Sequence, residues 1–455
     1  MQLILALIVA CQAEPTPPAS HCRIEVVEKS SGWPVPLVQL RTVNESRFVT
    51  DNAGIIVLDQ PELMGREVFF HVEGHGYEVP ADGFGYRGIR LTPSPGEIHR
   101  VEVSRTIIAQ RLGRLTGAGL FANSQRSGQE QTWRESGVVG SDSVQTAVYR
   151  GRHFWLWGDT SLFHYPLGIF HSSAATTDLS PLNSFEPPLR VKYEYYRDEN
   201  GRPRGVAKLP GDGPTWLSAM VSLPDKNGTP RLVASYAKIK PPLDAYEKGL
   251  CVWNDESQNF ERLKVVWSKS DGTPKSTPQP DGHSAFWKDE TGKEWVLFGN
   301  PLPALKCPAT FEAWQDPDQW QMLNPVKALT SASDDSEVRL HSGSIAWNPW
   351  RKRWVTIFMQ WFGKPSAFGE LWYAEADHPT GPWGPCIKVL SHQNYTFYNP
   401  RIHPEFTPAD SRVLLFEGTY TQQFADKPHP TPRYDYNQIM YRLNLTDDRL
   451  KPVQN

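Results

Sequence analysis

The 455-residue chain lacks the features that mark several large classes of protein. It has no run of five or more Lys and Arg, and its formal net charge is −3, whereas nucleic-acid-binding proteins normally present a basic face. It contains neither a G-x-x-x-x-G-K-[ST] phosphate loop nor an H-E-x-x-H metal motif. The stretch HSGSIAW is not the G-x-S-x-G turn of serine hydrolases. We therefore expect no nucleic-acid partner, and nucleotide or zinc-protease chemistry has no motif to support it.

Cysteine is also scarce. The five Cys residues are widely spaced, with no C-x-x-C pair and no Cys/His cluster, so the sequence supports no metal site and no cofactor. Cys251 and Cys386 lie in strand-like apolar runs, and we expect them to be buried free thiols.

Long apolar runs are absent beyond the N-terminus. Residues 3–10 form an apolar stretch that is too short to span a bilayer and is typical of an export signal. The following segment Ile8-Val9-Ala10-Cys11 resembles the lipobox of bacterial lipoproteins, which implies a lipid on Cys11. No Lys or Arg precedes the apolar stretch, and simple cleavage near Ala13 is the alternative. We expect an exported protein that meets the membrane only through this anchor, or is otherwise secreted.

Glycine, proline and aromatic residues are plentiful. The chain has 34 Gly, 40 Pro and 17 Trp, and 39% of its residues are hydrophobic. Because Pro costs about 3 kcal/mol inside a helix, this composition favours many short strands joined by turns. We expect an all-β protein with cores large enough to exclude global disorder.

Residues 22–110 follow a signal and linker segment, residues 1–21, and contain short apolar runs such as RIEVVEK, VPLVQLRTV and GIIVLD. Regular short strands between turn residues predict a small antiparallel sandwich. The string GWPVPLVQLRTVNESRFVTDNAGIIVLD resembles the carboxypeptidase-regulatory-like sandwich domain. That resemblance implies a scaffold or spacer and no catalytic role.

Residues 113–455 show a longer period. Five segments each contain an apolar hairpin followed by a strand rich in Trp or Tyr, as in VQTAVYRGRHFWLWGDT followed by GIFHSSAATT. A repeat of roughly 50–65 residues with about four strands each is typical of a β-propeller. We predict a five-bladed propeller; the alternative is an irregular all-β domain with chance similarity between segments.

Polar residues interrupt these strands at positions that a propeller would bring to one rim, since first strands start and second strands end there. Asp159 follows the strand FWLW, Glu417 follows VLLF, and Asp142 precedes the first strand of its segment. Loops on a rigid scaffold commonly carry function. The other residues predicted to line the mouth of the channel are Asp281, His283, His341, Glu370, Asn399, Arg401, Tyr420, Asp435 and Asn437.

A funnel of carboxylates, amides, an Arg and aromatic rings suits a carbohydrate. Sugar hydroxyls need polar partners, and sugar faces pack on rings. Cleavage of a glycosidic bond needs two carboxyl groups that flank the bond. Crowded carboxylates raise the pKa of at least one member, as a general acid requires.

The stretches FWLWGDTSLFHYPLGIFHSSAATT, YNPRI and LLFEGTYT resemble five-bladed propellers of a former unknown-function family that includes endo-D-arabinanases, related to family 43 glycoside hydrolases. The resemblance implies a catalytic carboxylate pair in the first blade. The matching residues are Asp142 and Asp159, 17 positions apart, and we expect Asp159 to act as base or nucleophile, with Asp142 or, as a substitute, Glu417 as its partner. Two alternatives remain open: a cell-surface propeller that binds glycans without turnover, and a structural lipoprotein. The sequence does not specify an oligomeric state.

Overall fold

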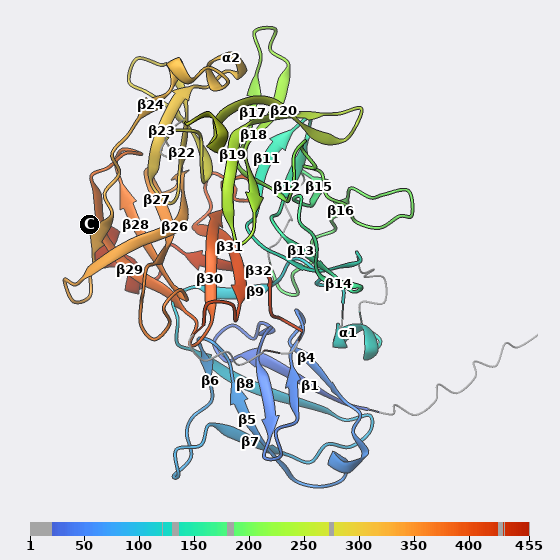
Figure 1. The fold of residues 1–455 in the computed structure, drawn as a ribbon. Coiled ribbons are helices and arrows are strands. Elements are labelled where there is room, and N and C mark those ends of the chain that lie inside the picture. Colours follow the sequence, from blue (N-terminus) through green and yellow to red (C-terminus); the bar gives the residue numbers. More distant parts are fainter. Residues whose placement is uncertain are drawn as a thin grey trace, which may run out of the picture.

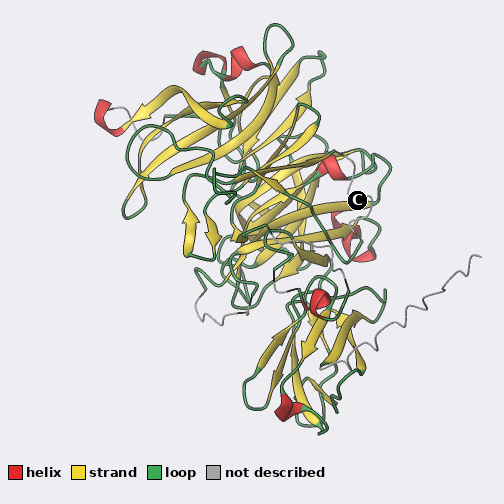
Figure 2. Cartoon of the chain, turned by 90° about the vertical axis from the view of Figure 1, so that its right-hand side faces the viewer, coloured by secondary structure: helices red, strands yellow, loops and turns green. Residues whose placement is uncertain are grey.

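The computed structural model describes residues 21–120, 122–129, 136–179, 186–272, 277–425, 431 and 433–454. The chain forms two parts, a small N-terminal unit of strands and a larger ring of sheets, which lie one below the other in Figure 1. Helices are few and short in the described ranges: α1 (Asn123–Arg126), α2 (Phe311–Trp314) and α3 (Lys451–Gln454). In Figure 2 strands dominate both parts. None of the helices that the structure describes has the length and apolarity to cross a membrane.

The N-terminal unit consists of two four-stranded sheets. One sheet has the order β4 (Ile55–Leu58), β1 (Cys22–Glu28), β8 (Ile98–Arg105), β6 (Tyr77–Glu78), and the other β3 (Arg47–Val49), β2 (Gln39–Thr42), β5 (Val68–Glu73), β7 (Gly88–Leu91). Ile24, Leu40, Phe70 and Val103 belong to one buried core that both sheets share. The sandwich is not wholly antiparallel as we expected, because β1 and β8 pair in parallel.

Five further sheets follow along the chain, and each begins with a hairpin. The first sheet contains β11 (Gln145–Tyr149), β12 (Arg152–Leu156), β15 (Ala174–Asp178) and β16 (Glu194–Tyr195). The second contains β17 (Thr215–Pro224), β18 (Pro230–Lys240), β19 (Asp244–Asn254) and β20 (Asn259–Ser268). The third contains β21 (His283–Lys288), β22 (Glu294–Gly299), β23 (Pro303–Pro308) and β24 (Gln321–Met322).

The fourth sheet contains β25 (Ala328–Thr330), β26 (Glu337–Asn348), β27 (Arg353–Gln360), β28 (Glu370–Ala376) and β29 (Trp383–Ser391). The fifth contains β30 (Thr396–Ile402), β31 (Val413–Thr421), β32 (Asn437–Asn444) and β9 (Gln110–Arg114). The fifth sheet therefore takes its outermost strand from the segment that leaves the N-terminal sandwich, which joins the two ends of the ring.

The inner strands close the ring. Strands β11, β17, β21, β26 and β30 contact one another in this order, and Arg401 on β30 donates hydrogen bonds to Thr146 on β11. This closed order of five radial sheets confirms the predicted all-β propeller fold. Aromatic side chains such as Trp155 and Trp157 are buried at the blade contacts, where large apolar areas supply most of the hydrophobic stabilisation.

A small additional sheet sits beside the first blade. It contains β10 (Val138–Ser141), β13 (Thr160–Leu162) and β14 (Tyr165–Ile169). Strand β10 precedes the first blade, β13 and β14 lie between its second and third strands, and β10 also contacts β32 of the fifth blade. This insertion fixes the segments that carry Asp142 and Asp159.

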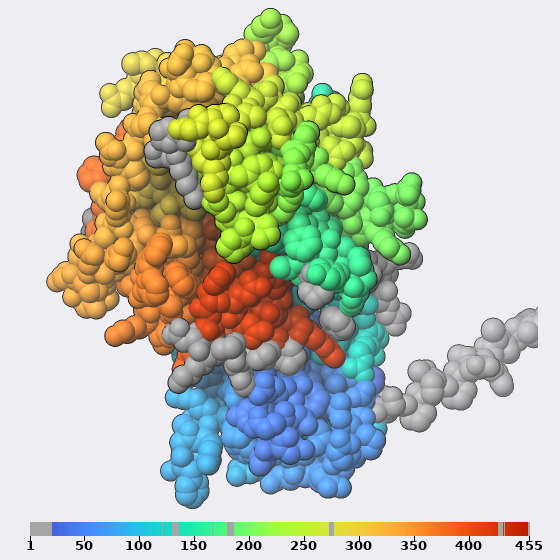
Figure 3. Space-filling view, in the orientation of Figure 1, coloured from blue at the N-terminus to red at the C-terminus, as the bar shows by residue number. Residues whose placement is uncertain are grey.

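The sandwich is bonded to the propeller directly. The Asn52 side chain donates to the carbonyls of Arg114 (2.8 Å) and Leu189 (3.0 Å) and accepts from the Arg114 amide at 2.8 Å. Tyr434 donates to the Thr50 carbonyl at 2.7 Å. In the space-filling view the blue sandwich lies below the red surface of the fifth blade (Figure 3).

The four cysteines among the described residues, Cys22, Cys251, Cys307 and Cys386, are buried free thiols. The prediction for Cys251 and Cys386 is thus confirmed. Cys11 and the export segment lie outside the described residues.

Candidate functional site

Asp142 and Asp159 lie side by side. Asp142 follows β10, and Asp159 stands between β12 and β13. The Asp142 amide donates to the Asp159 carbonyl at 3.2 Å, and the Gly158 amide donates to the Asp142 carbonyl at 2.9 Å. Two backbone hydrogen bonds therefore join the two acid-bearing turns.

Gly158 is required by this close approach. A Cβ atom at position 158 would lie 2.2 Å from Oδ1 of Asp142, far inside van der Waals contact. The Gly-Asp-Thr turn therefore leaves room for a second carboxyl group against its backbone. The apolar strand FWLW is followed by Asp159 because the turn after this strand forms part of the wall of a cavity that also contains Asp142.

Asp142 is held from the fifth blade. The Tyr398 hydroxyl donates to its Oδ2 at 2.7 Å, and the Tyr436 hydroxyl also hydrogen-bonds to it. Burial raises the pKa of Asp142, while these two phenols act in the opposite direction because they stabilise the carboxylate.

The pKa of Asp159 is raised far above its usual value. Burial, followed by the nearby charge of Asp142, raises the pKa of Asp159 to about 7, and a hydrogen bond from Trp216 partly opposes that rise. Two close carboxyl groups resist double ionisation. The charge of Asp142 therefore favours the protonated form of Asp159 up to about pH 7.

Both acids line a cavity of about 610 Å³. Its walls come from the first, second, third and fifth blades. The remaining lining residues are Ser143, Gln145, Gly158, Trp216, Leu217, Ser218, Ser235, Tyr236, Ala237, Lys248, Thr277, Pro278, Gln279, Asp281, Gly282, His283, Asn300 and Asn399. The volume is in the range that encloses a small ligand or part of a larger one.

Three of the other predicted residues reach this cavity. Asp281 is exposed there and accepts hydrogen bonds from Ser218 Oγ at 2.7 Å and from the Gly282 amide at 2.8 Å. Asn399 donates from its side chain to Ser143 Oγ at 2.7 Å. His283 is almost buried at the start of β21, and burial followed by the charge of Arg401 holds its pKa well below the usual value.

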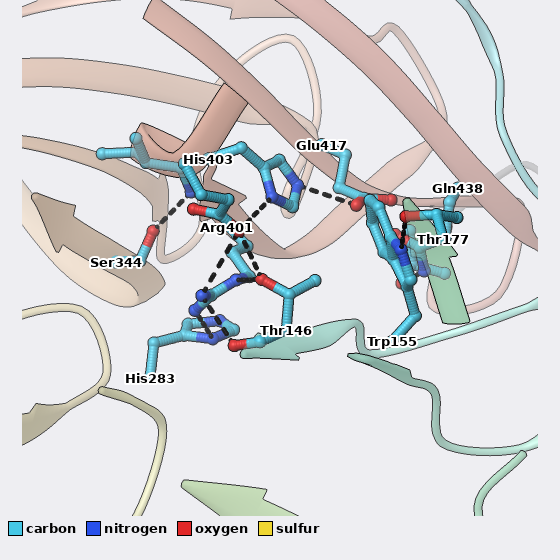
Figure 4. Close-up of polar contacts among 12 residues, drawn as sticks. Thr146, Trp155, Thr177, His283, Ser344, Arg401, His403, Glu417 and Gln438 are labelled. Atoms are coloured by element: carbon cyan, nitrogen blue, oxygen red, sulfur yellow. Dashed lines mark hydrogen bonds and ion pairs between the residues drawn. The ribbon is translucent and has the colours of Figure 1, made fainter. Parts of the chain in front are cut away.

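Arg401 lies behind the cavity wall, inside the ring. Figure 4 shows its guanidinium between Thr146 and His283. Nε donates to Thr146 Oγ1 at 2.8 Å, Nη2 donates to the Thr146 carbonyl at 3.0 Å, and Nη1 lies 3.4 Å from His283 Nδ1. Arg401 does not line the cavity; it fixes one of the residues that do.

Glu417 is not at the rim, contrary to our expectation. It lies within β31, opposite Arg401 in the register, and is completely buried. Its Oε1 lies 2.8 Å from His403 Nε2 (Figure 4). Strand β31 continues through Glu417 to Thr421, whereas the corresponding strand in the first blade, β12, ends at Leu156, before the Gly-Asp-Thr turn.

Tyr420 also differs from the prediction. Its ring stacks on Tyr395 with centroids 4.3 Å apart, and its hydroxyl lies 3.3 Å from His75 Nδ1 of the sandwich. Tyr420 therefore supports the junction of the two domains and does not line the acidic cavity. The reason is strand alternation, because neighbouring side chains on a strand face opposite sides.

Three more predicted residues support local backbone. Asp435 accepts from Thr421 Oγ1 at 3.0 Å and from the Gln422 amide at 2.7 Å. Asn437 is buried and donates to the Tyr434 carbonyl at 2.5 Å. Glu370 is buried at the start of β28 and pairs with Lys388 at 2.5 Å. None of the three lines the cavity.

His341 lies near the cavity without lining it. The neighbouring Ser342 Oγ accepts a hydrogen bond from the Asn399 amide at 3.1 Å. The His341 ring packs against Trp361, with centroids 4.5 Å apart. Burial lowers the pKa of His341.

Several cavity residues escaped the sequence reasoning. Trp216 and Lys248 come from the second blade, for which the sequence predicted no site residue, and Gln279 lies two positions before the predicted Asp281. Tyr398 and Tyr436 each precede a predicted residue, Asn399 and Asn437, by one position. Both tyrosines stand in the stretches YNPRI and YDYNQ, which already contained predicted residues, so their position beside those residues was the available signal.

Among the described residues no group of three or more His, Cys, Asp and Glu side chains has an arrangement that could hold a metal ion. The acidic cavity holds the two adjacent carboxyl groups of Asp142 and Asp159. Two phenols bond to Asp142, an indole bonds to Asp159, and amide, hydroxyl and ammonium groups surround the pair.

No protein-family model matches the chain, and none of the curated proteins matches it. Among solved structures, an exo-1,5-α-L-arabinanase from a bovine ruminal metagenomic library is similar at 12% identity, covering 68% of this chain and 94% of that chain, with a TM-score of 0.38. The native arabinanase of Bacillus subtilis is similar at 10% identity over 67% of this chain and 96% of that chain, with a TM-score of 0.35.

The α-L-arabinofuranosidase of Podospora anserina is similar at 12% identity over 74% of this chain and 96% of that chain, with a TM-score of 0.38. Similarities of this size carry no argument about activity, and the propeller description rests on the sheet order of the chain itself.

Proposed function

We propose that this protein is an exported glycoside hydrolase that uses Asp142 and Asp159 at the propeller cavity. The observation that carries the proposal is that the two carboxyl groups lie on hydrogen-bonded turns of one cavity, where burial and the charge of Asp142 raise the pKa of Asp159 to about 7. Pairs of titratable groups with separated pKa values are the usual basis for dividing acid and base roles.

Asp159 acts as the proton donor. Its pKa of about 7 keeps a proton on the carboxyl group in mildly acidic and neutral solution, which a general acid needs. The proton passes to the glycosidic oxygen as the bond to the anomeric carbon breaks, and the leaving sugar departs as an alcohol. This assignment reverses the base or nucleophile role that the sequence alone favoured for Asp159.

Asp142 acts as the carboxylate partner. The phenols of Tyr398 and Tyr436 orient it, and its charge stabilises the positive charge that develops on the sugar in the transition state. Water supplies the hydroxyl group that ends on the anomeric carbon, and the remaining proton of that water passes to the Asp142 carboxylate, so that the pair of acids again holds one proton. The polar side chains of Asp281 and Asn399, together with the indole of Trp216, surround the sugar in the cavity.

The proposal is tested with a panel of polysaccharides and their oligosaccharides, by following the release of reducing ends. We expect Asp159→Asn and Asp142→Asn each to lower the rate of turnover at least a thousandfold while the protein stays folded. Asp435→Asn is the matched control, since Asp435 is a partly buried carboxylate of the same domain that does not line the cavity. Unchanged turnover in Asp159→Asn refutes the assignment.

A glycan-binding protein without turnover is the second candidate, since the cavity groups serve binding equally well. Oligosaccharide that binds the wild-type protein and remains intact after days of incubation supports that candidate.

A further inference from the structure

We propose that the substrate is an extended polysaccharide chain, held outside the cavity by an aromatic platform on the fourth blade. The platform consists of His341, Trp361, Phe362 and Phe368. This inference rests on the proposed hydrolase function and adds a binding surface and a chain-length preference to it.

The four rings of the platform form one cluster. Trp361 lies 4.5 Å from His341, 5.8 Å from Phe362 and 6.3 Å from Phe368, measured between ring centroids. Phe362 and Phe368 are 5.2 Å apart. The cluster nevertheless remains open to solvent, with Trp361 38% and Phe362 64% exposed. Grouped exposed apolar side chains commonly mark a binding surface.

The platform adjoins the cavity. Strand β26 passes Ser342 and Gly343 directly after His341: Ser342 Oγ accepts from the amide of Asn399, and the Gly343 amide donates to Asn300 Oδ1 at 2.8 Å. Asn399 and Asn300 both line the cavity. Two direct hydrogen bonds thus tie the strand that carries His341 to the cavity wall.

The location follows from the blade pattern. Trp361 and Phe362 come directly after the second strand of the fourth blade, β27, as Asp159 comes after the second strand of the first. Second strands of a propeller end on one face, so the platform and the acids share that face. Phe424 is 70% exposed and lies beyond β31 in the fifth blade. Its ring centroid is 6.5 Å from that of Tyr398, the residue that donates a hydrogen bond to Asp142. Exposed rings therefore border the mouth in two successive blades.

A glycan chain fits this arrangement better than a protein partner. Pyranose and furanose faces present C–H groups that pack on exposed rings, and the strand that carries His341 is bonded to a cavity whose walls carry hydroxyl, amide and carboxyl groups. A chain cleaved at Asp142 and Asp159 extends from the cavity over the rings, so that several sugar residues contribute to its binding.

The test compares Trp361→Ala/Phe362→Ala with Trp347→Ala. Trp347 is 43% exposed and lies near the end of β26, the strand that also carries His341. Its ring packs beside Trp354, away from the platform. Binding of soluble arabinan, galactan, xylan and pectin is measured by affinity electrophoresis, in an Asp159→Asn background so that no chain is cut. Turnover of oligosaccharides of two or three sugars is measured with Asp159 intact.

We expect the double variant to lose at least tenfold in affinity for the polysaccharide that binds the wild type, with turnover of the short oligosaccharides unchanged, whereas Trp347→Ala changes neither. Equal losses in both variants, or an equal loss of short-substrate turnover, overturn the platform. Hydrolysis of short oligosaccharides without binding to any polymer also overturns it while the proposed function stands. Polymer binding that depends on Trp361 and Phe362 without any turnover retains the platform and refutes the hydrolase.

Discussion

Asp159→Asn provides the sharpest test of the site because it predicts a stability change together with a loss of turnover. In the folded protein, burial and the charge of Asp142 raise the pKa of Asp159 from 3.8 to about 7. A carboxyl group with a raised pKa stabilises the fold fully below the pKa of the unfolded chain, and that stabilisation is lost as the pH rises through the folded pKa. The contribution of Asp159 to the stability of the wild type therefore falls between about pH 4 and pH 7, whereas the neutral Asn variant is not subject to this loss.

The magnitude follows from the same pKa values. A rise from 3.8 to about 7 corresponds to about 4 kcal/mol, since one pH unit equals 1.36 kcal/mol. Asp159 is partly exposed to the cavity, so solvent screening lowers the expected difference in unfolding free energy to about 2 kcal/mol. Asp159→Asn should be more stable than the wild type by this amount at pH 8 and indistinguishable from it at pH 4.

The assay is urea unfolding of both proteins at a series of pH values, followed by tryptophan fluorescence. Asp289→Asn is a control of opposite sign. Hydrogen bonds from Thr291 and Trp295 lower the pKa of the half-buried Asp289 to about 2, so its stabilisation is present at neutral pH and fades as the pH falls below 4. Parallel stability curves for wild type and Asp159→Asn at all pH values would refute the desolvated, charge-coupled Asp159.

Three other substitutions test separate parts of the structure. Gly158→Ala places a methyl group against the carboxylate of Asp142 and should lower turnover at least tenfold. Gly83→Ala is the control, because the space around Gly83 is open, and it should leave turnover unchanged. Equal effects of the two substitutions would contradict the close approach of Asp142 to Gly158. Glu417→Gln removes the charge from the buried pair of Glu417 and His403 and should lower the unfolding free energy by about 3 kcal/mol, measured by urea titration. A loss of turnover at unchanged stability would instead indicate that Glu417 takes part in catalysis. Cys11→Ala should move the protein from the membrane fraction of a bacterial host to the soluble fraction in immunoblots, and an unchanged distribution would argue against lipidation.

The contrast between WGDT and FEGT shows where sequence similarity between blades misled. Both motifs place a carboxylate after an apolar run, but Asp159 leaves its strand and Glu417 remains within one. A difference of a few residues in strand length moves a carboxylate from a solvent-facing turn to the interior between blades. There it needs a buried partner, and His403 supplies it at 2.8 Å.

The repeating hairpins and aromatic strands of the sequence were enough to predict an all-β propeller, since apolar periodicity and turn residues are local properties. The Gly-Asp-Thr turn identified Asp159, and the spacing of one hairpin identified Asp142 beside it. Only the tertiary structure assigned Asp142 its partner Tyr398, 256 residues away, and turned Tyr420 toward the sandwich. The physical reason is that ring closure brings the first and last blades together, and the facing of each side chain depends on strand register, which residue order within a blade leaves open.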